Sequence, residues 1–186
     1  LLVIYVTLTV ACIATYSAIG MTALDAVVNG FATIATGGFS PSDVSFNKYA
    51  GAGEYFGALF MLLGSLPYIR YVQLMNGSAV PLWQDSQIRA YLKWLGMAVL
   101  AVTVWQVWAT AKPVETAFRE SLFNLTSIMS STGFFSGSFP TWGGFMLVVA
   151  FVLGVIGACS GSSAAGLSVF RVQLVIAVLK REVRRI

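Results

Sequence analysis

Long apolar runs without charges constrain this chain more than any other feature of its sequence. Residues 1–19 (LLVIYVTLTVACIATYSAI) carry no charge and are long enough to cross a hydrocarbon core of about 30 Å as one helix. Three further long runs cover 55–75, 92–111 and 142–179, and Gly64-Ser65-Leu66-Pro67 interrupts the first of these three. Of the 186 residues, 58% are hydrophobic and 10% charged, whereas soluble domains carry about a quarter charged residues. The sequence therefore predicts an all-α membrane protein with the lipid bilayer as a partner.

The supply of reactive side chains argues against most classes of enzyme. The chain has no His, and its two Cys, Cys12 and Cys159, both lie in apolar runs. Zinc sites, His-based catalytic triads and disulfide frameworks need more of these residues. The 7 acidic residues are scattered, so paired-carboxylate or two-metal chemistry has no cluster to use. We therefore expect a protein that is not an enzyme and binds no cofactor.

Two apolar segments are too short to cross a membrane. Residues 22–35 lead into Thr-Gly-Gly-Phe-Ser-Pro, and residues 114–129 lead into Ser-Ser-Thr-Gly-Phe. Glycine and proline oppose a continuous helix at these positions. Backbone that leaves the helix at membrane depth persists only where protein or a water-filled cavity satisfies its N–H and C=O groups. Each short segment is therefore predicted to enter and leave the membrane on one face.

The order long, short, long occurs twice, which indicates an internal repeat. An offset of 95 residues pairs Asp25 with Glu120, Asn29 with Asn124, Gly38 with Gly133 and Phe39 with Phe134. An acid thus stands at the predicted start of each short segment, and Gly-Phe stands at its end. We interpret the chain as two copies of one unit, residues 1–84 and 85–186.

Basic residues predict the orientation of these units. If both short segments re-enter from one face, the loops on that face, 20–54 and 112–141, carry three basic residues. The opposite face and its adjoining helix ends carry eight: Arg70, Arg89, Lys93, Arg171, Lys180, Arg181, Arg184 and Arg185. Cytoplasmic flanks are enriched in Lys and Arg. We expect a multi-pass protein of the cell inner (plasma) membrane, with the short segments' loops outside and the basic C-terminal end cytoplasmic. That end is interpreted as a membrane flank and not as a nucleic-acid surface.

The turns after the short segments have the composition of a cation filter. Backbone carbonyls can replace the hydration shell of a potassium ion, and glycine permits the backbone conformations that this requires. The short helix also directs its negative C-terminal end toward the ion. A single such turn is usually only a turn, but two at matching positions favour a filter over 35–39 and 130–134. The predicted ion-binding residues are Ala35, Thr36, Gly37, Gly38, Ser130, Ser131, Thr132 and Gly133.

The last long run is interrupted by small residues. Residues 156–168 include three Gly, four Ser and three Ala, and each helical Gly costs about 1 kcal/mol relative to Ala. One interpretation is a close helix–helix interface; the other is a broken helix over 154–168 whose intramembrane loop obstructs the pore below the filter. We predict such a gate loop from Gly157, Ala158, Cys159, Ser160, Gly161, Ser162, Ser163, Ala164, Ala165 and Gly166.

Three motifs in order resemble the TrkH branch of the Trk/Ktr/HKT superfamily of potassium transport proteins. They are TIATGGFS (33–40), SSTGFFS (130–136) and GACSGSSAAGLSVFRVQL (157–174), and the similarity extends to LMNGS (74–78) and WQDSQIR (83–89). The resemblance implies a pore of four M1-P-M2 repeats (helix, re-entrant pore helix with filter loop, helix), of which this chain resembles the second and third. It also implies that Gly38 and Gly133 are the signature glycines of potassium preference. The family's STGGGLK reads SSAAGLS here, which implies a stiffer gate loop.

The same resemblance implies potassium uptake, with potassium as the transported ion. The partners it implies are the missing repeats of the same polypeptide, a second copy in a homodimer, and a TrkA-like cytoplasmic nucleotide-binding regulatory subunit. Because Leu1 lies in an apolar run without an initiator Met, we expect an excerpt of a longer protein. A secondary transporter with discontinuous helices, a sodium-permeable superfamily member and a structural scaffold are the alternatives, and channel and coupled symport both stay open. The parallel order of the two units disfavours the inverted repeats of such a transporter.

Overall fold

The chain folds into helices joined by turns and loops. A computed structural model describes residues 1–77 and 80–185, so Ser78 of the LMNGS motif lies outside the described residues. These residues contain no strand, and the predicted all-α fold is confirmed for them. The elements are α1 (Leu2–Ala18), α2 (Ala23–Ile34), η1 (Ser45–Tyr49), α3 (Ala52–Gly64), α4 (Tyr68–Met75), α5 (Val80–Gln84), α6 (Ser86–Thr110), α7 (Val114–Met129), η2 (Phe139–Thr141), α8 (Gly144–Ile156) and α9 (Val169–Val183).

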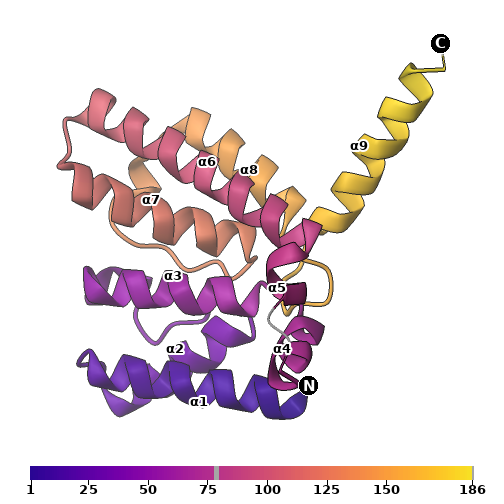
Figure 1. Cartoon of the computed structure of the whole chain (residues 1–186). Helices are drawn as coiled ribbons and strands as arrows, with labels where there is room; N and C mark the ends of the chain where they lie inside the picture. The colour runs from indigo at the N-terminus through magenta and orange to yellow at the C-terminus, as the bar shows by residue number, and fades with distance from the viewer. Residues whose placement is uncertain (78–79, 186) are drawn as a thin grey trace.

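The helices form two packed groups that meet between α3 and α7 (Figure 1). In one group α1, α2, α3 and η1 surround an apolar core that includes Tyr16, Ile34 and Met61. In the other group α6, α7 and α8 enclose a core that includes Tyr91 and Met129. Helix α9 extends away from both groups, and its free end is the C-terminus of the chain (Figure 1).

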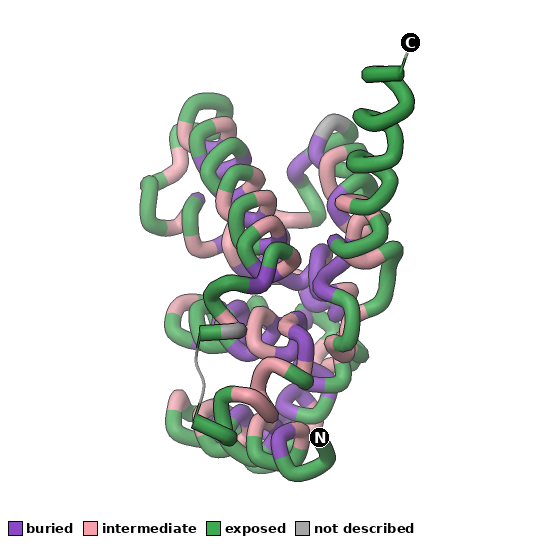
Figure 2. Tube along the Cα trace, turned by 45° about the vertical axis from the view of Figure 1, so that its right-hand side comes forward, coloured by how far each residue is buried: buried purple, intermediate pink, exposed green. Residues whose placement is uncertain are grey.

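The distribution of polar residues is that of a protein in lipid. Many apolar side chains of α1, α6 and α8 are exposed, among them Trp108 at 87% and Phe151 at 71%, and Figure 2 shows exposed positions along the outer sides of the helices. Helix α7, in contrast, buries a row of polar residues: Glu120, Ser121, Asn124, Thr126 and Ser127. Polar groups inside and apolar groups outside reverse the arrangement expected in water.

The second predicted span, 55–75, is interrupted at residues 64–67, as the sequence predicts. Helix α3 ends at Gly64, α4 starts at Tyr68, and the two axes differ by 87°. Pro67 lacks an N–H and disfavours helical backbone at the residue before it. Among the described helices, α6 alone is long and apolar enough to cross a membrane, and the α3–α4 pair is a second only if the bent pair counts as one span.

Helix α6 begins six residues before its predicted start at residue 92, because Asp85 caps it. The Asp85 carboxylate accepts the N–H of Gln87 at 2.8 Å and an ion pair from Arg70 at 2.7 Å. Capping by a side-chain oxygen favours a helix even where the first turn is polar. The last predicted run is interrupted as expected, but the break covers residues 157–168 and not 154–168, because α8 continues to Ile156.

Candidate functional site

Both short helices end in the same turn. The residue after the C-cap is left-handed in each, Thr36 with φ 52° and Ser131 with φ 60°. The following N–H bonds a carbonyl five positions back, from Gly37 to Ala32 at 2.7 Å and from Thr132 to Ser127 at 2.9 Å. This is a Schellman closure, in which glycine usually occupies the left-handed position. Side-chain-bearing residues in that conformation indicate strain that the surroundings hold.

The two turns meet at Gly38. This glycine has φ 69°, and a Cβ built on it would overlap the carbonyl oxygen of Thr132 and lie 3.3 Å from the carbonyl carbon of Gly133. Gly133 has φ 91°, but a Cβ there would have no neighbour within 4 Å. The structure therefore brings stretches 35–38 and 130–133 into backbone contact, and at Gly38 the contact leaves no room for a side chain.

The predicted gate loop lies against both turns. The Thr36 hydroxyl donates to the carbonyl of Ser163 at 2.9 Å, and the Ser131 hydroxyl donates to the carbonyl of Ala165 at 3.2 Å. These are the two left-handed residues, so their unusual backbone aims their hydroxyls at the loop. The non-helical path predicted for 157–166 is confirmed; its role as a gate stays a prediction.

The rest of the loop is fixed to the bend between α3 and α4 and to the start of α6. The N–H of Cys159 donates to the carbonyl of Ser65 at 3.3 Å, and the carbonyl of Gly161 accepts the N–H of Tyr68 at 3.0 Å. The N–H of Ser160 donates to a side-chain oxygen of α6, Gln87 Oε1, at 3.1 Å. Tyr68 is not among the residues predicted from the sequence, although it stands 95 residues before Ser163, at the repeat offset.

The comparisons with known proteins bear on these motifs. No protein-family model matches the chain. The chain is 38% identical over 167 residues to the Trk system potassium uptake protein TrkI of Halomonas elongata, covering 89% of this chain and 34% of that protein. It is 30% identical over 189 residues to the Trk system potassium uptake protein TrkH of Escherichia coli, covering 98% of this chain and 38% of that protein. The resemblance to TrkH is confirmed.

A solved structure shows the same helical arrangement. The crystal structure of the potassium transporter TrkH from Vibrio parahaemolyticus matches with a TM-score of 0.91 and 28% identity, covering 98% of this chain and 40% of that chain. The chain thus spans between a third and two fifths of the length of these relatives. Its fold therefore follows that of the matched part of TrkH.

The second turn, residues 130–133, is braced from two sides by residues outside the predicted site. The Phe46 ring, from η1, lies 4.7 Å from the ring of Phe134 and 5.0 Å from that of Phe123, centroid to centroid. The N–H of Phe46 also donates to the carbonyl of Phe135 at 3.1 Å. The sequence feature that could have indicated this contact is the lone Phe within the polar stretch 42–54.

Asn124 supplies the second brace. Its amide nitrogen donates to the carbonyl of Ser136 at 2.9 Å, and its Oδ1 accepts the N–H of Ser136 at 3.0 Å. Its repeat equivalent, Asn29, is also buried, but its amide nitrogen donates to the sulfur of Met21 at 4.0 Å. Within the described residues the Oδ1 of Asn29 has no hydrogen-bond partner. The two matched asparagines therefore have different hydrogen-bond partners.

The acid of the first short helix stands where the sequence predicted it. Asp25 is in the first turn of α2, and its N–H donates to the capping hydroxyl of Thr22 at 3.2 Å. Lys48 Nζ lies 2.8 Å from the Asp25 carboxylate, which also accepts the hydroxyl of Tyr49. The hydrogen bond to Asp25, followed by that to Tyr49, raises the pKa of Lys48 above its ordinary value.

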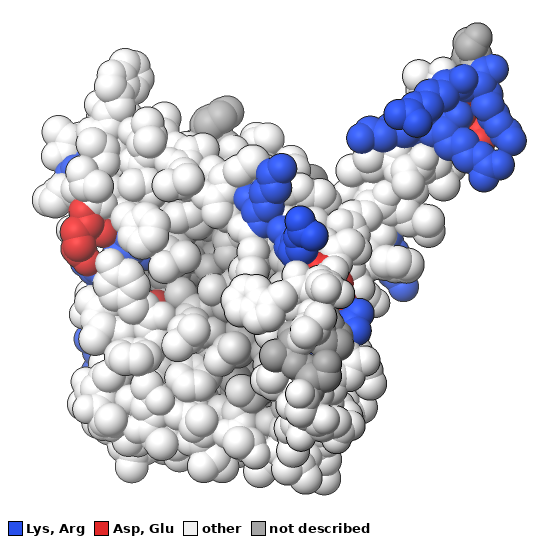
Figure 3. Space-filling view, viewed as in Figure 1, with Lys and Arg blue, Asp and Glu red and all other residues white. Residues whose placement is uncertain are grey.

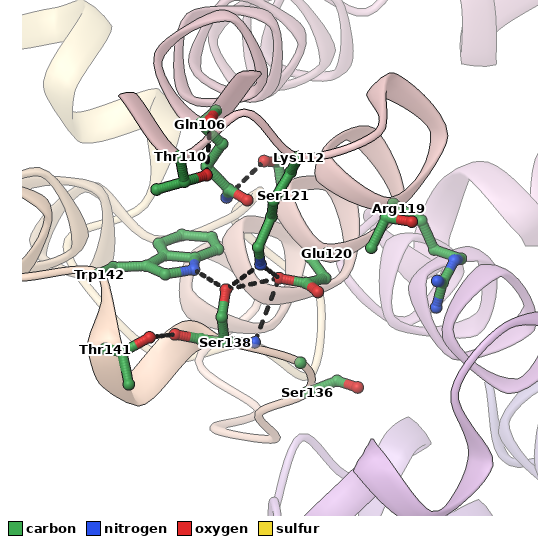
Figure 4. A network of polar contacts seen from close by, with 12 residues as sticks. Gln106, Thr110, Lys112, Arg119, Glu120, Ser121, Ser136, Ser138, Thr141 and Trp142 are labelled. Atoms are coloured by element: carbon green, nitrogen blue, oxygen red, sulfur yellow. Dashed lines mark hydrogen bonds and ion pairs between the residues drawn. The ribbon is translucent and has the colours of Figure 1, made fainter. Parts of the chain in front are cut away.

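The acid of the second short helix is not at the helix start, so that prediction was wrong. Helix α7 begins at Val114, directly after Pro113, and its first-turn acid is Glu115. Glu120 lies in the second turn and accepts three hydrogen bonds (Figure 4): from Lys112 Nζ at 2.8 Å and from the hydroxyl and N–H of Ser138 at 2.7 and 3.1 Å. It therefore ties the helix to the loop after the second turn.

One buried ion pair joins the two halves at this end of α7. Arg119 pairs with Glu54 of α3, whose side chain is fully buried, and with Glu115 at 2.9 Å. In Figure 4 Arg119 points away from the Glu120 network, toward α3. Among residues 1–77 and 80–185, no group of three His, Cys, Asp or Glu side chains could hold a metal ion.

Proposed function

We propose that this chain is part of a potassium uptake protein that conducts the ion through a channel-like filter in a membrane. The relatives that it matches are Trk system potassium uptake proteins. Because the chain spans at most 40% of their length, the activity of the whole protein is inferred. The observation that carries the proposal is the meeting of two equivalent helix ends at Gly38 and Thr132.

In this proposal, residues 1–84 and 85–186 are two M1-P-M2 units. Helices α2 and α7 are the pore helices, and carbonyls of residues 35–38 and 130–133 replace water around a dehydrated potassium ion. Each pore helix ends at its filter stretch, so its negative C-terminal end favours a cation there. The left-handed residues Thr36 and Ser131 support this role, because strained backbone held by its surroundings is typical of functional sites.

The loop 157–166 is the proposed gate. It contacts the left-handed residue of each filter stretch through hydrogen bonds. Non-helical backbone of this length within a membrane must face protein or water, which supports a place in the ion path over a helix-packing interface.

The proposed setting is the inner (plasma) membrane with the filter loops outside. Support comes from the basic residues at the free end of α9, Lys180, Arg181, Arg184 and Arg185, which gather in one cluster (Figure 3) and suit a cytoplasmic flank. The proposed partners are the lipid bilayer, the remaining repeats of a four-repeat pore, a second copy, and a nucleotide-binding regulatory subunit. No catalytic role is proposed.

Rubidium flux into liposomes that contain the full-length protein tests the function. A potassium channel-like protein admits rubidium without a coupling gradient, whereas a secondary transporter requires one and a scaffold admits none. Comparable sodium uptake would identify a sodium-permeable member of the superfamily and contradict the proposal.

Gly133→Ser tests the filter. A Cβ at this site meets nothing within 4 Å, so the substitution acts through the backbone preference at φ 91°, which costs about 1–3 kcal/mol for a residue with a side chain. We expect the preference for potassium over sodium to fall, because a side chain at this position disturbs the backbone that would coordinate the ion. Unchanged preference in folded protein would remove Gly133 from the filter.

Deletion of Ser162 to Ala165 tests the gate. In the full-length protein the shortened loop should raise basal rubidium uptake and leave the preference among cations intact. Uptake at the parental level, in protein shown to be folded by its elution and thermal melting, would make this segment a packing interface.

A further inference from the structure

Ser163 stands where the loop meets three helix ends of the first half. Its hydroxyl lies 2.8 Å from the carbonyl oxygen of Ile34, 3.0 Å from that of Gly64 and 3.0 Å from the hydroxyl of Tyr68. These residues are the last of α2, the last of α3 and the first of α4. One small side chain therefore joins the pore helix, the bent helix pair and the loop.

The backbone of Ser163 is held in the same place. Its N–H donates to the carbonyl of Gly64 at 3.2 Å, and its carbonyl accepts the hydroxyl of Thr36 at 2.9 Å. The last carbonyls of a helix have no partner within the helix, so Ser163 supplies donors to the ends of α2 and α3. Its hydroxyl has one proton, which the two carbonyls share, while its lone pairs can accept the proton of Tyr68.

The ends of the loop touch each other at two glycines. Gly157 has φ 69° and Gly166 has φ 99°. A Cβ on Gly166 would lie 2.9 Å from the Cα of Gly157, and a Cβ on Gly157 would lie 2.5 Å from the carbonyl oxygen of Ala165. A loop whose ends are in contact is an Ω-loop. Residues 158–165 are thus joined to α8 and α9 through a narrow neck.

We propose that Ser163 is a positioning residue that holds the loop beneath the filter, so that loss of its hydroxyl shifts the loop toward a displaced, conducting state. This inference rests on the proposed gate role of the loop. A substitution shifts the equilibrium between two loop positions only through contacts that differ between them. The contacts of the Ser163 hydroxyl with Ile34, Gly64 and Tyr68 exist only while the loop lies against the first half.

The test is basal rubidium uptake by the full-length protein in liposomes. Ser163→Ala should raise uptake about fivefold, the factor that corresponds to one hydrogen bond of about 1 kcal/mol, with the preference for potassium over sodium unchanged. Ser163→Thr keeps the hydroxyl and should stay near the parental rate. Tyr68→Phe should give a smaller rise and add nothing to Ser163→Ala, because it acts through the same hydroxyl. Ser17→Ala, which removes an exposed hydroxyl of α1, is the control.

The outcomes separate this inference from the proposed function. Parental uptake in folded Ser163→Ala protein overturns it, and so does a loss of cation preference, which would make the hydroxyl a support of the filter. The deletion of Ser162 to Ala165 is measured in parallel. A rise with the deletion but not with Ser163→Ala overturns the positioning role alone, whereas no rise with the deletion overturns the gate itself.

Discussion

The breaks in the second long helix of each half lie at matching places but have different forms. In the first half α3 stops at Gly64 and α4 resumes at Tyr68, with a bend of 87°. The residue 95 positions after Gly64 is Cys159, inside the loop 157–168 of the second half. The short break exposes helix-end carbonyls, and the long one supplies the N–H groups of Ser163 and Cys159 that bind Gly64 and Ser65. The sharp bend in the first half thus forms the surface to which the loop of the second half binds.

The two proposed filter turns also differ from each other, although their backbones have the same shape. Gly38 and Gly133 both have positive φ, which L side chains adopt at a cost. Gly38 also faces the Thr132 carbonyl with no space for a Cβ, whereas the Cβ direction of Gly133 is open. Gly133 is therefore required by its backbone conformation alone. Gly38 is required both by its backbone conformation and by the close approach of the Thr132 backbone.

Alanine at each glycine tests that distinction and should give the largest effect. Gly38→Ala must force the two turns apart, so we expect potassium uptake to be abolished or the yield of folded protein to fall sharply. Gly133→Ala carries only the backbone cost of about 1–3 kcal/mol and should retain measurable uptake. Flux, together with thermal melting in detergent, distinguishes the two.

Gly96→Ala is the matched control. Gly96 lies within α6 with nothing within 4 Å of an added Cβ, so alanine there should stabilise the helix by up to about 1 kcal/mol. Equal losses at Gly38 and Gly133 would show that the contact with Thr132 does not limit the site.

The sequence predicted the features that depend on local backbone chemistry. Glycine and proline positions marked both turns, the break before Tyr68 and the non-helical loop, because these residues act on their own neighbours. It placed the start of α6 too late, since hydropathy does not register a cap such as Asp85. It also placed Glu120 at the start of the second short segment through its match with Asp25, although the apolar run was predicted to begin at residue 114, where α7 does begin.

The contacts that assemble the site could not be predicted from the local sequence pattern. Phe46, Tyr68 and Arg119 act across the interface between the halves, and their partners in the other half are more than about 60 positions away in the sequence. Single side chains of this kind carry no periodic signal. The lone Phe in the stretch 42–54 and the repeat offset of Tyr68 and Ser163 were clues, but neither shows which residues are in contact.

Removing the matched asparagines should give an intermediate effect. Asn124→Ala leaves the buried N–H and carbonyl of Ser136 without their side-chain partner, and each such group costs about 1–3 kcal/mol. Asn29→Ala removes an amide whose Oδ1 has no partner in the described residues, so its loss should be about 1 kcal/mol or less. Thermal melting in detergent measures both, and a larger loss at Asn29 would contradict the distinction.

The lysines that pair with the two acids should give the smallest effect, and their order follows from burial. Lys112, with its side chain 24% exposed, pairs with Glu120, and Lys112→Met should lower stability by about 1–2 kcal/mol. Lys48, at 48% exposed, pairs with Asp25, and Lys48→Met should have the weaker effect, because solvent screens an exposed pair.

A pH series sharpens the result for Lys48. Its pKa is raised in the folded protein, chiefly by the hydrogen bond to Asp25, so the folded state holds the proton more tightly than the unfolded state. The stabilisation is therefore complete below the ordinary lysine pKa of about 10.4 and is lost as pH rises through the higher folded value. The difference in melting temperature between the parental protein and Lys48→Met should stay constant from about pH 7 to 9 and shrink above about pH 10.4. A difference that already falls between pH 7 and 9 would mean that another group, and not the Lys48 ammonium, provides the stabilisation at Asp25.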